Sequence, residues 1–207
     1  MTYFRLILAA LTWATLALQF TLSIRAEGVA LAFVNLLGYF TILTNIFVAL
    51  VLTLPRVWPR SAIGRLFDCS GVHLSAVASI VIVGAVYHAL LASQWEPHGW
   101  ELVSDTALHT LVPVGFTLYW FVASPKEALS ARVLRAVMVY PTAYTVYVMA
   151  RGEVLGRYPY FFIDVPTIGY AAAVRNVVGI LLLLLAVASG LSVLARRASV
   201  ELQRVKG

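Results

Sequence analysis

Six long apolar stretches, separated by short polar or proline-bearing segments, constrain this chain more than any other feature. An α-helix needs about 20 apolar residues to cross the hydrocarbon core of a bilayer. In hydrocarbon every backbone polar group must be satisfied internally, and the alternation typical of a β-barrel is missing. The sequence predicts an all-α integral membrane bundle of six transmembrane helices in one domain, 1–207. The expected helices cover 4–24, 32–54, 73–93, 104–123, 132–150 and 170–195.

The composition excludes a water-soluble fold. Hydrophobic residues make up 61% of the chain, charged residues only 12%, and the mean hydropathy is +0.89. Soluble domains are about 45–50% apolar and about 25% charged, so no soluble core hides this excess. The single cysteine, Cys69, excludes an intramolecular disulfide and a cysteine-cluster metal site. We expect neither a metal nor a cofactor.

The distribution of charge predicts the orientation in the membrane. The net charge is +6, and 11 of the 15 basic residues fall on the termini and the second and fourth loops. Because cytoplasmic segments carry the excess of Lys and Arg, we expect both termini in the cytoplasm. The basic face suits anionic lipid and needs no nucleic acid. These residues are Arg5, Arg56, Arg60, Arg65, Lys126, Arg132, Arg135, Arg196, Arg197, Arg204 and Lys206.

Polar side chains interrupt the second apolar stretch. Gly38, Thr41 and Asn45 follow i, i+3, i+7 spacing and share one helix face, with Thr44 beside them. Polar groups in hydrocarbon are costly unless they have partners or a function. Threonines in membrane helices often bond their own backbone or a neighbouring helix, so a packing role is an open alternative. Gly38 would let a helix or a ligand approach closely.

The fourth stretch carries Asp105 and His109 at i, i+4, so the carboxylate can reach one imidazole nitrogen and leave the other free. A hydroxyl, an imidazole and a carboxylate are the parts of a nucleophile–base–orienter triad. At 1.5 Å per residue, Thr41 and His109 both lie within about 13 Å of the outer helix ends, so we expect one site in the outer half of the bilayer. Hydrolysis of an ester by such a triad passes through an oxyanion, to which Asn45 or His88 would donate a hydrogen bond.

The loop before the last stretch adds candidate substrate contacts. Tyr158 and Tyr160 belong to an aromatic run that ends at Asp164 and predicts a lid, a re-entrant turn or an interfacial aromatic belt. Arg175, near the start of the last helix, would pair with Asp164, bind a substrate carboxylate or extend to the interface. Two other functions stay open: a non-enzymatic lipid-binding, transport or structural protein, and a haem protein with His88 and His109 as axial ligands.

Three motifs carry a family resemblance: F-T-I-L-T-N around Thr41, L-H-T-L-V-P around His109, and G-R-Y-P-Y-F-F-I-D before the last helix. With these motifs the chain resembles the bacterial six-helix "Pr-six-Pr" membrane proteins, which implies a location in a bacterial inner membrane. They are distantly similar to the androgen-induced and androgen-dependent tissue-factor-pathway-inhibitor-regulating proteins. The resemblance implies an intramembrane threonine hydrolase that cleaves fatty acid esters of hydroxy fatty acids. It places the nucleophile on Thr41, with Thr44 as a neighbouring candidate, and the base on His109.

The predicted orientation is tested with single-cysteine variants in a Cys69→Ser background. Thiols introduced by Arg60→Cys and at either terminus should react only after the membrane is permeabilised, because the basic segments stay in the cytoplasm. A thiol introduced by His98→Cys should react with an impermeant maleimide in intact cells. Labelling of the C-terminal thiol in intact cells would contradict the orientation.

Overall fold

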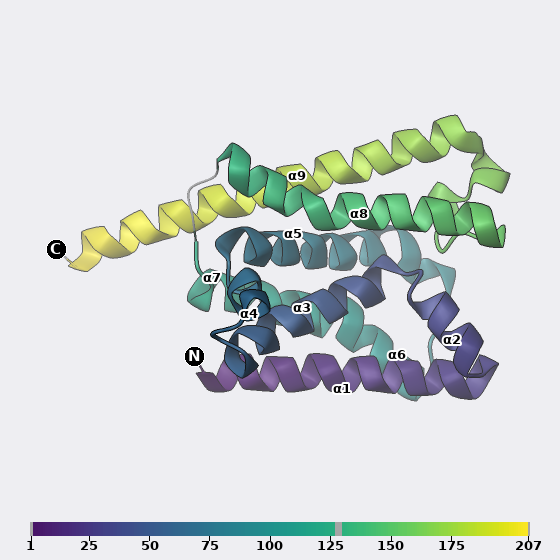
Figure 1. Cartoon of the computed structure of the whole chain (residues 1–207), viewed down its shortest axis with the longest axis horizontal. Coiled ribbons are helices and arrows are strands. Elements are labelled where there is room, and N and C mark those ends of the chain that lie inside the picture. Colours follow the sequence, from purple (N-terminus) through teal and green to yellow (C-terminus); the bar gives the residue numbers. More distant parts are fainter. Residues whose placement is uncertain (1, 127–129, 207) are drawn as a thin grey trace.

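In a computed structural model of the chain, residues 2–126 and 130–206 are described, with side chains as far as residue 197 (Figure 1). Within these ranges the fold is all-helical, and six helices are long and apolar enough to cross a membrane, which confirms the predicted class. The side chains of Arg204 and Lys206, included in the charge argument, lie outside the described part. The two described ends of the chain, Thr2 and Lys206, lie at the same end of the bundle.

Four spans contain one long helix each: α1 (Thr2–Glu27), α3 (Phe40–Val57), α8 (Ala131–Leu155) and α9 (Val165–Lys206), which bends at Gly169. The third span is α5 (Ser70–Val86) followed by a π-helical turn, η1 (Tyr87–Leu91), and a 3-10 turn, η2 (Ala92–Gln94). The fourth is α6 (Trp100–Thr106), a π-helical turn, η3 (Ala107–Leu111), and α7 (Val112–Ala123). Shorter elements are α2 (Val29–Leu36), α4 (Ala62–Phe67) and η4 (Phe161–Ile163).

The helix predicted over 32–54 is not continuous. α2 ends at Leu36, residues 37–39 form a turn with Tyr39 extended, and α3 begins at Phe40. Side chains from elsewhere satisfy the backbone at this break: the Tyr144 hydroxyl donates to the carbonyl of Gly38 at 2.9 Å. Thr41 is consequently the second residue of a helix and not part of a helix interior.

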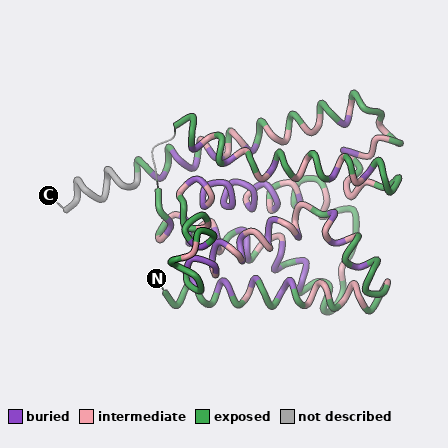
Figure 2. The backbone as a smooth tube through the Cα atoms, viewed as in Figure 1, coloured by how far each residue is buried: buried purple, intermediate pink, exposed green. Residues whose placement is uncertain are grey.

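The central helix is α5, which packs against α3, α7, α8 and α9. Figure 2 shows it buried along most of its length. Small residues allow its neighbours to approach, as is common between membrane helices. A Cβ at Gly84 would lie 3.2 Å from the carbonyl oxygen of His109, and one at Gly71 would lie 2.9 Å from the Cβ of Ala136. The fourth and fifth spans therefore pack directly on the α5 backbone.

A buried arginine compensates for a proline in α3. Pro55 has no N–H, so the carbonyl of Val51 loses its partner one turn later in the helix. The Arg5 guanidinium donates through Nη2 to this carbonyl at 3.0 Å and through Nε to the carbonyl of Leu52 at 2.7 Å. The first span is thereby joined to α3 through the backbone.

Pro141 in α8 creates the same vacancy at the carbonyl of Val137. The hydroxyl of Ser75, which is buried on α5, donates to that carbonyl at 2.8 Å. The prolines inside α3 and α8 are thus each matched by a donor from another helix, and the freed carbonyl becomes a specific contact between helices.

A double-mutant cycle tests the Arg5–Pro55 relation. Arg5→Met should lower the free energy of unfolding in detergent by about 1–3 kcal/mol, because it leaves buried carbonyls without a donor. In a Pro55→Ala background the loss should be smaller, since the introduced alanine would supply the N–H that the Val51 carbonyl lacks. Equal losses in both backgrounds would show that Arg5 does not compensate for the proline.

Candidate functional site

A cavity of about 600 Å³, called here the polar cavity, is lined by α2 and by the last turns of α1 and α8. These segments lie at the end of the bundle opposite the termini (Figure 1). The wall of the cavity brings together five residues that the sequence predicted for the site, drawn from α3, α6, η3 and the loop before α9. They are Thr41, Asp105, His109, Tyr158 and Tyr160. Residues far apart in the sequence thus share one chamber, as predicted for Thr41 and His109.

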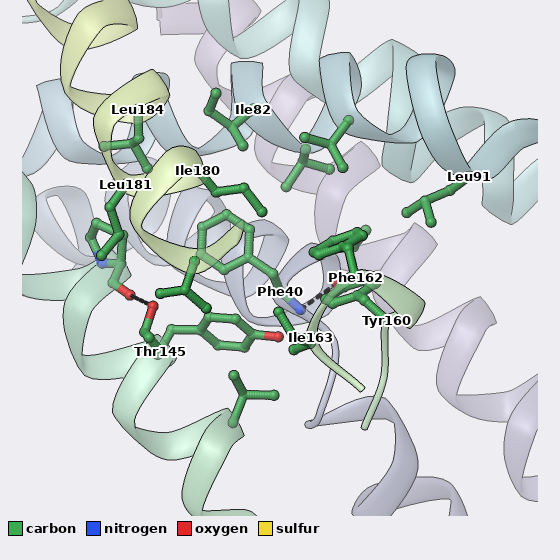
Figure 3. Close-up of a pocket in the computed structure, with 17 residues that line it drawn as sticks. Phe40, Ile82, Leu91, Thr145, Tyr160, Phe162, Ile163, Ile180, Leu181 and Leu184 are labelled. Carbon is green, nitrogen blue, oxygen red and sulfur yellow. Dashed lines mark hydrogen bonds between the residues drawn. The ribbon is translucent and has the colours of Figure 1, made fainter. Parts of the chain in front are cut away.

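A second cavity of about 70 Å³, called the apolar slot, lies between α3, α5, α8 and α9 (Figure 3). Its wall is mostly hydrocarbon, with Phe40, Ile82, Phe162 and Leu184 among its residues. The polar cavity and the slot share Thr41, Leu91 and Tyr160. Thr41 therefore lies on the boundary between a polar and an apolar compartment.

His109 is held by Asp105 in the way that the i, i+4 spacing predicts. Its Nδ1 lies 3.1 Å from Oδ1 of Asp105 and 3.0 Å from the backbone carbonyl of Asp105. The Tyr87 hydroxyl donates to the other carboxylate oxygen at 2.5 Å, and the Tyr87 ring stacks on the imidazole with centroids 3.7 Å apart. The sequence did not single out Tyr87, because a tyrosine in an apolar stretch has no distinguishing pattern.

Both π-helical turns contribute to the polar cavity. η1 supplies Tyr87 and Leu91, and η3 supplies Leu108 and His109. Pro113, which follows η3, has no N–H to donate to the carbonyl one turn earlier, so the regular series of helical hydrogen bonds is interrupted there. Such π-turns inside helices occur frequently at functional sites.

Tyr160 fixes the start of α3. Its hydroxyl accepts the N–H of Phe40 at 2.8 Å and also interacts with the side chain and backbone of Thr41. The Tyr160 ring stacks on Phe162, with centroids 5.1 Å apart, and meets Tyr39 edge-on. Desolvation raises the pKa of Tyr160 to about 12, so the phenol keeps its proton at neutral pH.

Thr44 and Asn45 lie outside both cavities. Thr44 is fully buried, and its hydroxyl lies 2.8 Å from the Tyr140 hydroxyl on α8. The Asn45 amide donates to the carbonyls of Thr41, at 2.9 Å, and Leu108, at 3.3 Å, and thereby links α3 to η3. The amide suggested as an oxyanion donor is thus occupied by backbone, and of the two threonines only Thr41 faces a cavity.

His88 also lies outside both cavities. It is exposed, and its Nε2 is 3.0 Å from the hydroxyl of Thr110. It therefore cannot donate to an oxyanion at Thr41 in this arrangement. His88 and His109 share no chamber, so the geometry gives no support to the bis-histidine haem alternative.

Asp164 and Arg175, the contacts predicted near the last helix, line neither cavity. Asp164 accepts a hydrogen bond from Thr167 at 2.5 Å at the start of α9. Arg175 is exposed, lines neither cavity, and makes no ion pair with Asp164 among the described residues. The arginines on the wall of the polar cavity are instead Arg151 and Arg157.

The different roles of the two threonines predict different effects on stability. Thr44→Val should lower the free energy of unfolding by about 1–3 kcal/mol, because it leaves the buried Tyr140 hydroxyl without a partner. Adding Tyr140→Phe should recover part of the loss, since both polar groups are then gone. Detergent unfolding of the two single variants and the double variant measures this. A double variant less stable than both single variants would contradict the pairing.

Comparison of the chain with protein-family models, curated proteins and solved structures gives no match in any of the three.

Proposed function

We propose that this protein is an intramembrane hydrolase of lipid esters, of the type formed between a fatty acid and a hydroxy fatty acid. Thr41 is the nucleophile and His109 the general base, in the outer half of a bacterial inner membrane. The observation that carries the proposal is the position of Thr41 on the wall shared by the polar cavity and the apolar slot. A lipid ester has the same division, with a polar reacting centre beside hydrocarbon.

The contacts of His109 define which ring nitrogen carries the hydrogen in the neutral imidazole. Both groups within reach of Nδ1, the carbonyl and the carboxylate of Asp105, are acceptors, so Nδ1 carries the hydrogen. In the neutral ring Nε2 then keeps a lone pair, which can accept a proton in the proposed reaction. Tyr87 holds Asp105 from the other side, so the carboxylate orients the imidazole and stabilises the imidazolium that forms.

The start of α3 supplies the oxyanion donors. First-turn N–H groups have no partner within their own helix, and the amino end of a helix carries a partial positive charge. The Tyr39 side chain does not cap α3, and the N–H of Ile42 follows directly after the nucleophile. The Tyr160 hydroxyl, which accepts from Phe40 and interacts with the Thr41 side chain, lies beside these N–H groups. These donors replace the Asn45 amide and His88 in the mechanism.

The reaction proceeds in two halves. Nε2 of His109 takes the Thr41 proton as Oγ1 attacks the ester carbonyl, and the tetrahedral oxyanion forms beside Tyr160 and Ile42. The intermediate collapses, the ester C–O bond breaks, and the leaving alcohol receives the proton from His109. Water then attacks the acyl-threonine, again with His109 as base, and the carboxylic acid leaves as the threonine hydroxyl is restored.

The sequence motifs add support to this proposal. F-T-I-L-T-N carries Thr41, L-H-T-L-V-P carries His109, and the loop motif carries Tyr160 and two side chains of the slot, Phe162 and Ile163. Each segment of the proposed family resemblance therefore contributes to the same pair of cavities.

Fluorophosphonate labelling and ester hydrolysis test the proposal together. The wild type should be labelled, and Thr41→Ala should lose both label and turnover. His109→Gln should lower kcat by at least about 100-fold, the usual contribution of a general base. Thr44→Val is the matched control, because it removes a threonine hydroxyl that faces neither cavity. A wild type that binds lipid esters yet neither turns them over nor reacts would favour the lipid-binding or transport alternative.

A further inference from the structure

Two arginines on the wall of the polar cavity have no acidic partner. The only ion pair among the described residues is that of His109 with Asp105. Two acids also line the cavity, but both are already engaged: Glu27 accepts from the Asn35 amide at 2.6 Å, and Asp105 is held by Tyr87 and His109. Arg151 and Arg157 are thus uncompensated cations in a chamber that has room for a ligand.

Arg151 is held in place by the break between α2 and α3. Its Nη2 donates to the carbonyl of Val34 at 2.7 Å, and the guanidinium packs over Gly38. A Cβ at Gly38 would lie only 2.9 Å from Cζ of Arg151, so the glycine provides the space that this side chain occupies. A guanidinium has five N–H donors, and this anchoring leaves most of them for a ligand.

We propose that Arg151 and Arg157 form a subsite for the carboxylate of the substrate, so that the hydroxy-acid half of the ester lies in the polar cavity and the acyl half points into the apolar slot. This inference rests on the proposed function. Guanidinium groups bind carboxylates through paired, charge-assisted hydrogen bonds, which suits recognition of a free acid. The cavity of about 600 Å³, whose wall carries the polar side chains, would receive the half with the additional polar group.

The binding experiment uses Thr41→Ala, which keeps ligands intact. Hydroxystearate should bind this variant about tenfold more tightly than its methyl ester, the effect of one charged hydrogen-bonded contact. Adding Arg157→Gln should abolish this preference, and the fold should tolerate it, because Arg157 makes no described hydrogen bond or ion pair within the protein. Arg175→Gln is the matched control: it removes an equally exposed arginine that lines neither cavity, and the preference should persist.

Equal binding of the acid and its methyl ester would contradict the subsite. An equal loss of the preference for the acid in the Arg157→Gln and Arg175→Gln variants would contradict it as well. Short-chain phosphatidylglycerol serves as a competitor. If it binds more tightly than hydroxystearate and depends on Arg157, the arginines recognise lipid phosphate and the carboxylate assignment is wrong. Gly38→Ala tests the role of Arg151, since the added methyl group should displace the guanidinium. It should weaken binding of the acid, as Arg157→Gln does.

An activity measurement separates this inference from the proposed function. In the wild-type background, Arg157→Gln should raise KM for the free-acid ester about tenfold and leave its methyl ester unaffected. If neither ester is hydrolysed but acid binding still depends on Arg157, the hydrolase proposal fails and the carboxylate subsite stands. If both esters are hydrolysed equally by both proteins, the hydrolase proposal stands and the subsite fails.

Discussion

Backbone hydrogen bonding at interrupted helices is the constraint on which this bundle depends. Hydrocarbon offers no hydrogen-bond partner to a freed carbonyl or N–H, so the protein itself must supply a partner at each interruption. Arg5 donates to the carbonyl freed by Pro55, and Ser75 donates to the carbonyl freed by Pro141. At the break over 37–39, two tyrosine hydroxyls bond to the backbone. Because each of these side chains comes from another element, the contacts fix which helices are neighbours as well as keeping the backbone satisfied.

The candidate site occupies the same interruptions. Thr41 is in the first turn of α3, directly after a break, Tyr87 lies in one π-turn and His109 in the other. Irregular backbone is tolerated at membrane depth where it lines a cavity, and that is its position here. A regular six-helix bundle would have packed these segments closely. The departures from regularity open the chamber and bring polar side chains to its wall.

Hydropathy and charge are enough to predict the class and number of spans, because the bilayer imposes a length and a composition on each. Local spacing is enough for Asp105 and His109, which contact each other within one helical turn. Which of Thr41 and Thr44 faces a cavity needed the structure, since both lie in the same motif and only the packing of α8 buries the second. The break near Gly38 and the approach of Arg151 depend on contacts over more than 100 residues, which periodicity does not record.

The π-helical turn η3 has a consequence for the register of the chain. A π-turn holds one residue more than an α-helical turn, so winding the same residues of η3 as regular α-helix would rotate α6 against α7 by about 100°. Either Asp105 would then leave the cavity, or the buried faces of Phe116 and Trp120 would turn out of the core. The wide turn between Asp105 and Phe116 is therefore as much a part of the site as the side chains themselves.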